Sequence, residues 1–154
     1  MAGGQFRTAV PLNPNVVANS FGLGTDFRWR INDRLGMVGE AFVGQAMGFL
    51  DAGVLQNTNS VTFTPIRTRG AWGEIYYYIT PCLHTHWGAA IDNPIDRDLA
   101  PSQIARNQTA YANLIWDVSS SLRFGFEFTW RETDYVLLQN NEGAGFHTQV
   151  QWSF

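Results

Sequence analysis

The sequence lacks several features that mark common classes of protein. It has no lysine, a single cysteine (Cys82) and 15% charged residues, whereas about a quarter of the residues of an average soluble domain are charged. One cysteine excludes an internal disulfide framework. The net charge of −3 is too small to indicate nucleic acid or an acidic membrane surface as partner, so no nucleic-acid partner is expected.

The sequence also lacks a convincing membrane helix and a leader peptide. The only candidate helix, residues 36–55, contains Glu40, Gln45 and Asp51 together with five glycines, a composition unsuited to lipid. The first five residues have neither a basic region nor an apolar stretch. A protein destined for an outer membrane needs a leader, so a chain of that kind is expected to be a mature form or a piece of a longer protein.

Apolar and aromatic residues are abundant, and they alternate with polar ones. In residues 122–133 five apolar side chains, Leu122, Phe124, Phe126, Phe128 and Trp130, occupy every second position. This period of two is typical of a strand with two different faces. We therefore predict an all-β chain. The predicted strands are residues 17–30, 35–49, 67–79, 83–91, 107–118, 122–133 and 143–154, with 5–10 as a further candidate.

The connections between these strands are alternately short and long. Tight turns are predicted at residues 32–34, 80–82 and 119–120, and long loops at 50–65, 92–106 and 134–142. Short turns at one rim and long loops at the other are typical of outer-membrane barrels. Most strands also reach the roughly ten residues that cross a bilayer when tilted. The predicted fold is an antiparallel transmembrane β-barrel with seven to eight strands, in which residues 1–154 form a single barrel domain or the C-terminal segment of a larger barrel.

The last stretch, GAGFHTQVQWSF (residues 143–154), ends on aromatic residues at alternate positions. It resembles the terminal aromatic signal of bacterial outer-membrane β-barrels, in which the last residue is typically Phe. On that resemblance Phe146, Val150, Trp152 and Phe154 form the assembly signal. The implied partners are outer-membrane lipid and the barrel assembly machinery, and the implied location is the outer membrane.

Two further stretches carry a resemblance to a particular family. GEIYYYITPCLHTHWGAAIDNPIDRDL (residues 73–99) and RNQTAYANLIWDVSSSLRFGFEFTWRETDY (residues 106–135) are similar to the C-terminal part of large bacterial porins of the trimeric DcaP type. The resemblance implies a water-filled channel for passive diffusion of small hydrophilic solutes. The resemblance also implies a homotrimer as the form of assembly. Because no motif of the sequence completes a catalytic or cofactor site, no enzymatic activity and no cofactor are expected. Such porins have about sixteen strands, so part of a larger barrel is expected.

The polar face of the predicted strands would line such a pore. Its residues are Asp26, Arg28, Arg30, Glu40, Glu74, His84, His86, Arg123, Glu127, Arg131, His147 and Gln149. Glu74, Arg123, Glu127 and Arg131 are expected to set the charge of the pore, because rings of lumen charges determine which ions pass. Residues 50–65 are the candidate for a loop that folds inward as a constriction.

Two other interpretations stay open at the level of sequence. A closed eight-stranded barrel would be just filled by its own side chains and would serve a structural or adhesive role. A soluble lipocalin-like barrel would bind a ligand and turn Phe124, Phe126 and Phe128 inward. His84 and His86 have a spacing that could hold a metal, but no further Cys or carboxylate is placed to complete the site, so no metal is predicted.

Overall fold

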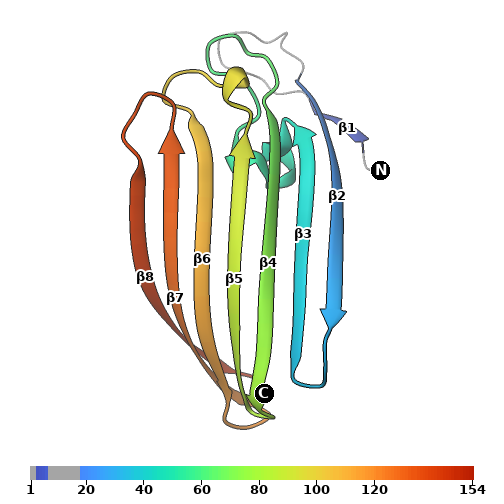
Figure 1. Cartoon of the computed structure of the whole chain (residues 1–154), viewed down its shortest axis with the longest axis vertical. Helices are drawn as coiled ribbons and strands as arrows, with labels where there is room; N and C mark the ends of the chain where they lie inside the picture. The colour runs from blue at the N-terminus through green and yellow to red at the C-terminus, as the bar shows by residue number, and fades with distance from the viewer. Residues whose placement is uncertain (1–2, 7–17) are drawn as a thin grey trace.

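The chain forms one antiparallel sheet whose strands lie side by side in chain order (Figure 1). The structure is a computed structural model that describes residues 3–6 and 18–154. Its strands are β1 (Gly3–Phe6), β2 (Ala18–Arg30), β3 (Leu35–Gln45), β4 (Arg67–Thr80), β5 (Leu83–Pro94), β6 (Ile104–Asp117), β7 (Leu122–Tyr135) and β8 (Asn141–Trp152). The prediction of an all-β antiparallel fold is confirmed.

The seven long predicted strands are all present, with differences at their ends. β3 stops at Gln45 because Ala46 takes a left-handed backbone (φ 48°), and a short 3-10 helix, η1 (Met47–Leu50), follows it. β5 runs on to Pro94, and β6 begins at Ile104. The predicted strand 5–10 overlaps β1, and its residues 7–10 lie outside the described residues.

The connections separate into two rims, as predicted. Residues 31–34, 81–82 and 118–121 connect strands at one rim, and the longer segments 46–66, 95–103 and 136–140 connect them at the other. Polar side chains fix two of the short turns. Asn32 Oδ1 accepts hydrogen bonds from the backbone N–H groups of Arg34 and Leu35, and Ser119 Oγ accepts one from Leu122. Asn and Ser are favoured in turns for this reason.

The strand register divides the sheet into two chemically different faces. Paired residues of an antiparallel ladder point to the same face. Phe124 pairs with Trp116 on one side and Val150 on the other, and Glu127 pairs with Asn113 and His147. We call the face of Phe124 the apolar face and the face of Glu127 the polar face.

The apolar face carries a band of large side chains that are open to the surroundings. Phe128 is 52% exposed, and Trp152 is 66% exposed. On β7 the band runs from Leu122 to Trp130, and Glu132 and Asp134 follow it towards the long-loop rim. Nine strand residues tilted by about 40° rise about 21 Å, close to the roughly 25 Å apolar band of outer-membrane barrels.

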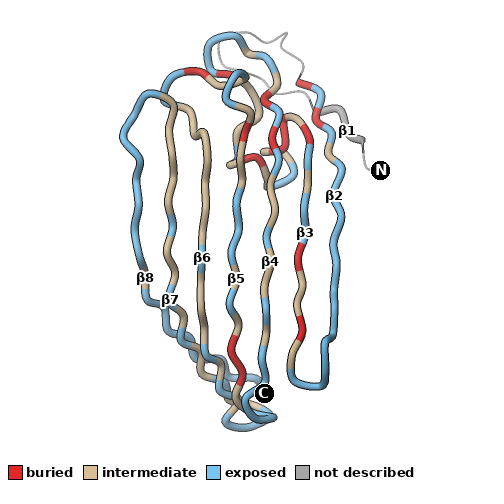
Figure 2. Tube along the Cα trace, viewed as in Figure 1, coloured by how far each residue is buried: buried red, intermediate tan, exposed pale blue. Residues whose placement is uncertain are grey.

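Buried residues gather where the long connection after β3 packs back on the sheet (Figure 2). This connection, residues 46–66, is called the inward segment below. It contains η1 and η2 (Gly53–Leu55). The side chains of Ala46, Met47 and Ile66 are buried there together with Ala18 and Thr68. Most of the remaining sheet is a single exposed or half-buried layer, with buried exceptions such as His84 and Thr85 on β5.

The described strands do not close on themselves. Each pairs only with its neighbours in the chain, and β1 and β8 are not paired with each other. This sheet is therefore a curved wall with two free edges, and not a closed eight-stranded barrel (Figure 1).

Among the described residues, no helix has the length and apolar character needed to span a membrane.

Candidate functional site

The polar face collects all twelve residues that the sequence singled out for a pore wall. The pairing connects them in rows that run across the strands. One row joins Arg30 of β2 to His86, Glu127 and His147, and another joins Asp26 and Glu40 to Arg131. Arg28 and Glu74 share a third row, and His84 and Gln149 share a fourth. Arg123 pairs with Asp117 and Gln151 near the short-turn rim.

A chain of hydrogen-bonded side chains occupies this face between β4 and β6. His86 Nδ1 lies 2.6 Å from Glu74 Oε1, and its Nε2 lies 2.9 Å from Nδ1 of His84. The other carboxylate oxygen of Glu74 accepts a hydrogen bond from the Tyr111 hydroxyl at 2.5 Å. The ring of Tyr78 stacks on His84 with centroids 4.9 Å apart. Both imidazoles are thereby held in fixed orientations.

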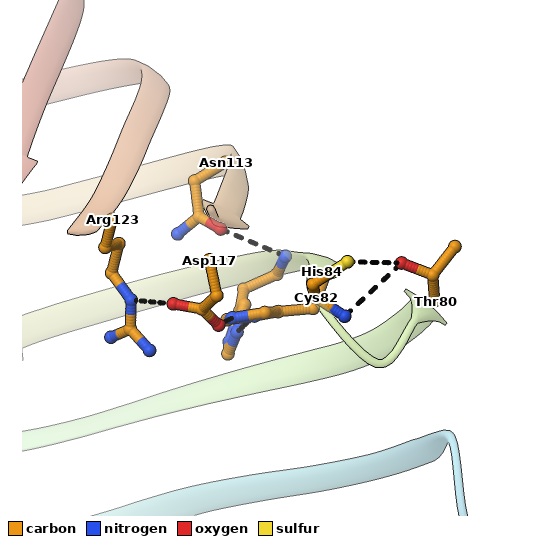
Figure 3. Close-up of polar contacts among 7 residues, drawn as sticks. Thr80, Cys82, His84, Asn113, Asp117 and Arg123 are labelled. Atoms are coloured by element: carbon orange, nitrogen blue, oxygen red, sulfur yellow. Dashed lines mark hydrogen bonds and ion pairs between the residues drawn. The ribbon is translucent and has the colours of Figure 1, made fainter. Parts of the chain in front are cut away.

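The chain continues to the short-turn rim through Asp117. Figure 3 shows this carboxylate between His84 and Arg123: its Oδ2 lies 3.4 Å from His84 Nε2, and its Oδ1 accepts a hydrogen bond from Arg123 Nε at 2.5 Å. The His84 side chain is only 7% exposed, and that of Asp117 is 30% exposed. We call Tyr111, Glu74, His86, His84, Asp117 and Arg123 the histidine network.

Three members of this neighbourhood were not among the predicted site residues. Tyr111 and Asp117 belong to the network, and Asn113 accepts a hydrogen bond from the backbone N–H of His86 at 3.1 Å. All three occupy alternate positions of β6, so the alternation of residues 107–118 could have assigned them to the polar face. Their contacts with β5 follow from the strand register, which alternation alone does not give.

A second group on the polar face differs from the histidine network, because its charged side chains do not face opposite charges. Asp26 and Glu40 pair directly across β2 and β3, two like charges in one row, and Glu40 accepts a hydrogen bond from Trp72 Nε1 at 3.3 Å. Within the described residues, neither Asp26 nor Arg131 makes a hydrogen bond or an ion pair. We call Asp26, Glu40, Trp72 and Arg131 the open row.

Large rings on the polar face lie over glycines of the neighbouring strand. A Cβ atom on Gly36 would lie 2.2 Å from the Tyr76 hydroxyl, and one on Gly88 would lie 2.3 Å from Cζ of Tyr111. These distances are far inside van der Waals contact, so only a residue without a side chain fits under each ring. The glycines thereby let Tyr111 lie across β5 and reach Glu74.

The inward segment covers the polar face at the long-loop rim. The backbone N–H of Val54 donates to Asp92 Oδ2 at 2.7 Å, and Asp92 Oδ1 accepts from the Thr68 hydroxyl at 2.8 Å. Gln56 pairs with the backbone N–H and C=O of Ile104, each at 2.9 Å. Residues 50–65, predicted to fold inward, lie within this segment (Figure 1).

The loop between β5 and β6 is tied to β4 by an ion pair. Arg67 places its Nη2 atom 2.6 Å from Oδ1 of Asp98 in the short helix η3 (Asp96–Asp98). Hydrogen bonding from the Arg67 side chain holds the pKa of the Asp98 carboxyl below its usual range. Asp98 is therefore a charged anchor of this rim at neutral pH.

The apolar face contains three of the four residues of the predicted assembly signal. Phe146, Val150 and Trp152 project from β8 on this face, and Phe154 follows the end of the strand. Phe126 and Phe128 of β7 lie on the same face and are 41% and 52% exposed. A soluble ligand-binding barrel would instead have enclosed them. In the parts that the structure describes, no group of three or more His, Cys, Asp or Glu is arranged to hold a metal ion.

These features define a fold class: the chain is an antiparallel sheet of the outer-membrane β-barrel type, with an apolar face on one side and a polar face on the other. No known protein-family model and no curated protein matches the sequence. Its fold is similar to that of the outer membrane channel DcaP of Acinetobacter baumannii, with a TM-score of 0.70 and 16% sequence identity. The match covers 86% of this chain and 40% of that one. The chain thus spans less than half the length of the channel that it resembles in fold.

Proposed function

We propose that this chain forms part of the wall of a water-filled outer-membrane channel for the passive diffusion of small hydrophilic solutes. The observation that carries the proposal is the division of one sheet into an apolar face and a polar face that carries the twelve predicted pore-wall residues. A lipid bilayer on one side and water on the other favour that division. The fold similarity to an outer membrane channel supports the same function.

The free edges of the sheet favour a wide barrel over a small one. A strand edge in lipid leaves backbone N–H and C=O groups unsatisfied, so the wall must be completed by further strands. Tyr76, Tyr78, Tyr111 and Trp72 project on the polar face together with the charges, and the inward segment occupies part of the same side. A wider barrel leaves room for water beside these groups, whereas eight strands enclose little more than their own side chains.

The inward segment is the proposed constriction, because it is anchored on the polar face by Asp92 and Ile104. Glu74, Arg123, Glu127 and Arg131 are the proposed determinants of pore charge. Of these, Arg131 makes no ion pair within the described residues, whereas Arg123 is paired with Asp117. Arg131 is therefore expected to act most directly on passing ions.

The proposed partners follow from the apolar face. Its aromatic and aliphatic band is proposed to contact outer-membrane lipid, and Phe146, Val150, Trp152 and Phe154 are proposed to be read by the barrel assembly machinery. Assembly as a homotrimer is the proposed quaternary state. Phe154→Ser should slow insertion into membranes without changing the folded wall, because Phe154 lies beyond the last strand.

Single-channel recording in a planar lipid bilayer tests the channel function. The refolded chain is compared with the same gene product extended upstream. We expect stepwise conductance from the form that completes the barrel. Shortening the inward segment should change the size of the conductance steps. Folding into detergent without conductance from either form would instead indicate a closed structural barrel and would overturn the proposal.

A further inference from the structure

The two histidines of the network present their ring nitrogens to each other. His84 Nδ1 and His86 Nε2 are 2.9 Å apart. The remaining ring nitrogens face carboxylates: His86 Nδ1 lies 2.6 Å from Glu74 Oε1, and His84 Nε2 lies 3.4 Å from Asp117 Oδ2. Each imidazole is thus placed between a carboxylate and the other imidazole.

The hydrogen positions of the pair follow from its partners. An ionised carboxylate only accepts hydrogen bonds, so His86 Nδ1, which lies 2.6 Å from Glu74, carries the hydrogen and leaves a lone pair on His86 Nε2. When His84 carries its hydrogen on Nδ1, it donates to that lone pair and both imidazoles are neutral. When His84 carries its hydrogen on Nε2, towards Asp117, its Nδ1 presents a second lone pair, and a metal ion can take the place of the shared proton.

We propose that His84 and His86 form a binding site for a divalent transition-metal ion, with Cu²⁺ the preferred occupant in place of the proton. Two bonds of about 2.0 Å at a right angle separate their nitrogens by about 2.8 Å, whereas a tetrahedral site separates them by about 3.3 Å. The 2.9 Å between the two nitrogens, an ordinary hydrogen-bond length, is compatible with two neighbouring ligands of a square-planar Cu²⁺. Nitrogen ligands also bind Cu²⁺ more strongly than Ni²⁺ or Zn²⁺.

The surroundings of the pair are those of a metal site. Histidine ligands commonly donate their other ring N–H to a carboxylate, which fixes the tautomer and raises ligand basicity. Glu74 and Asp117 are in that position here, and Glu74 is itself held by the Tyr111 hydroxyl. The His86 side chain is 20% exposed, so an ion can reach the pair from the polar face.

Two protein ligands leave the remaining coordination positions to water, since the described residues offer no third His, Cys, Asp or Glu in place. The site is therefore an exchangeable one and not a structural centre. It depends on the fold of β4, β5 and β6, and it does not depend on whether the wall conducts solutes.

Copper titration of the chain folded in detergent tests the site, with calorimetry for affinity and electron paramagnetic resonance for the ligands. All variants carry Cys82→Ser, because the exposed Cys82 thiol would reduce and bind copper. We expect one Cu²⁺ per chain with splitting from two nitrogens. His84→Asn and His86→Asn should each weaken binding at least tenfold.

His147→Asn is the matched control, because His147 shares the polar face but contacts Thr129 of β7 and neither of the other histidines. It should leave copper affinity unchanged. Glu74→Gln keeps both ligands and should weaken binding roughly tenfold while the two-nitrogen spectrum persists. Equal loss in His147→Asn, equal binding by the urea-unfolded chain, or no binding above the level of His84→Asn would each overturn the proposal.

Discussion

The polar face contains two regions that differ in whether their charged side chains are paired. In the histidine network each charged side chain faces a partner at hydrogen-bond or ion-pair distance, from Tyr111 and Glu74 to Asp117 and Arg123. In the open row Asp26 and Arg131 have no such partner within the described residues, and two carboxylates face each other across β2 and β3. Paired groups contribute mainly to holding strands together, whereas unpaired ones leave their charge uncompensated on the polar face, where it would act on ions in the proposed channel.

The largest expected difference in stability is between two variants that each remove one carboxylate, one from each region. Glu74→Leu leaves His86 and the Tyr111 hydroxyl without their acceptor and should lower the free energy of unfolding by about 2–4 kcal/mol. Glu40→Leu removes the same charge from the open row and should cost under about 1 kcal/mol, because its one hydrogen bond with a described residue is the long bond from Trp72. Urea unfolding in detergent, followed by tryptophan fluorescence, measures both. Equal losses would remove the distinction between the two regions.

Glycine substitutions probe the same contrast through packing. Gly88→Ala should lower the free energy of unfolding by about 1–3 kcal/mol, because the new methyl group displaces the Tyr111 ring from β5. Gly143→Ala, on β8, is the matched control, since nothing lies within 4 Å of a Cβ atom there. Its effect should stay within about 0.5 kcal/mol. The same urea titration compares the two variants. Destabilisation by Gly143→Ala without destabilisation by Gly88→Ala would contradict the packing of the Tyr111 ring over Gly88.

Arginine removal tests which charges act on ions. Arg131→Ala should shift the reversal potential of the proposed channel towards cations and change stability by less than about 0.5 kcal/mol, because no ion pair with a described residue is broken. Arg123→Ala should also shift it towards cations, but with a loss of stability, since Asp117 loses its partner. Bilayer recording under a salt gradient measures the potential. No shift in either variant would count against a pore lined by this face.

The smallest effect is expected at the long-loop rim. The pKa of Asp98 is held down in the folded state, so its pairing with Arg67 stabilises the chain above the unfolded carboxyl value of about 4 and is lost as the pH falls below it. Asp98→Asn should therefore lower the thermal midpoint slightly at pH 6, and the difference from the unchanged chain should shrink as the pH falls below about 4. A difference that persists at low pH would assign the effect to packing.

Much of the architecture could be predicted because each long strand alternates between two chemistries. Residues 122–133 identify both the strand and its faces, and Asn32 and Ser119 mark turns that the structure confirms. The predicted end of the strand at residue 49 is wrong, since β3 ends at Gln45. The prediction extends too far because residues 46–49 continue the apolar content of the strand. Met47 is apolar for another reason: it packs over Gly22 and Gly44, on strands β2 and β3, from a 3-10 helix.

The histidine network could be predicted only in part. Alternation assigns Glu74, His84 and His86 to one face, but the 2.6 Å contact between Glu74 and His86 requires the particular alignment of β4 with β5. That alignment depends on the two-residue turn at 81–82 and on the irregular pairing between Tyr78 and Thr80. Such a shift by one residue moves side chains relative to their partners without changing the sequence pattern.

The rings that lie over glycines also bear on how neighbouring strands find their alignment during folding. Tyr76 faces Gly36, and a slip by two residues would bring it opposite Arg34 or Val38, where a side chain already fills the space. Tyr111 faces Gly88, and the same slip would bring it opposite His86 or Ala90. Each ring thus accepts one partner and rejects the nearest alternatives. The side chains of the wall therefore select the strand register themselves. A misaligned pair of strands is destabilised as it forms, before the remaining strands are added.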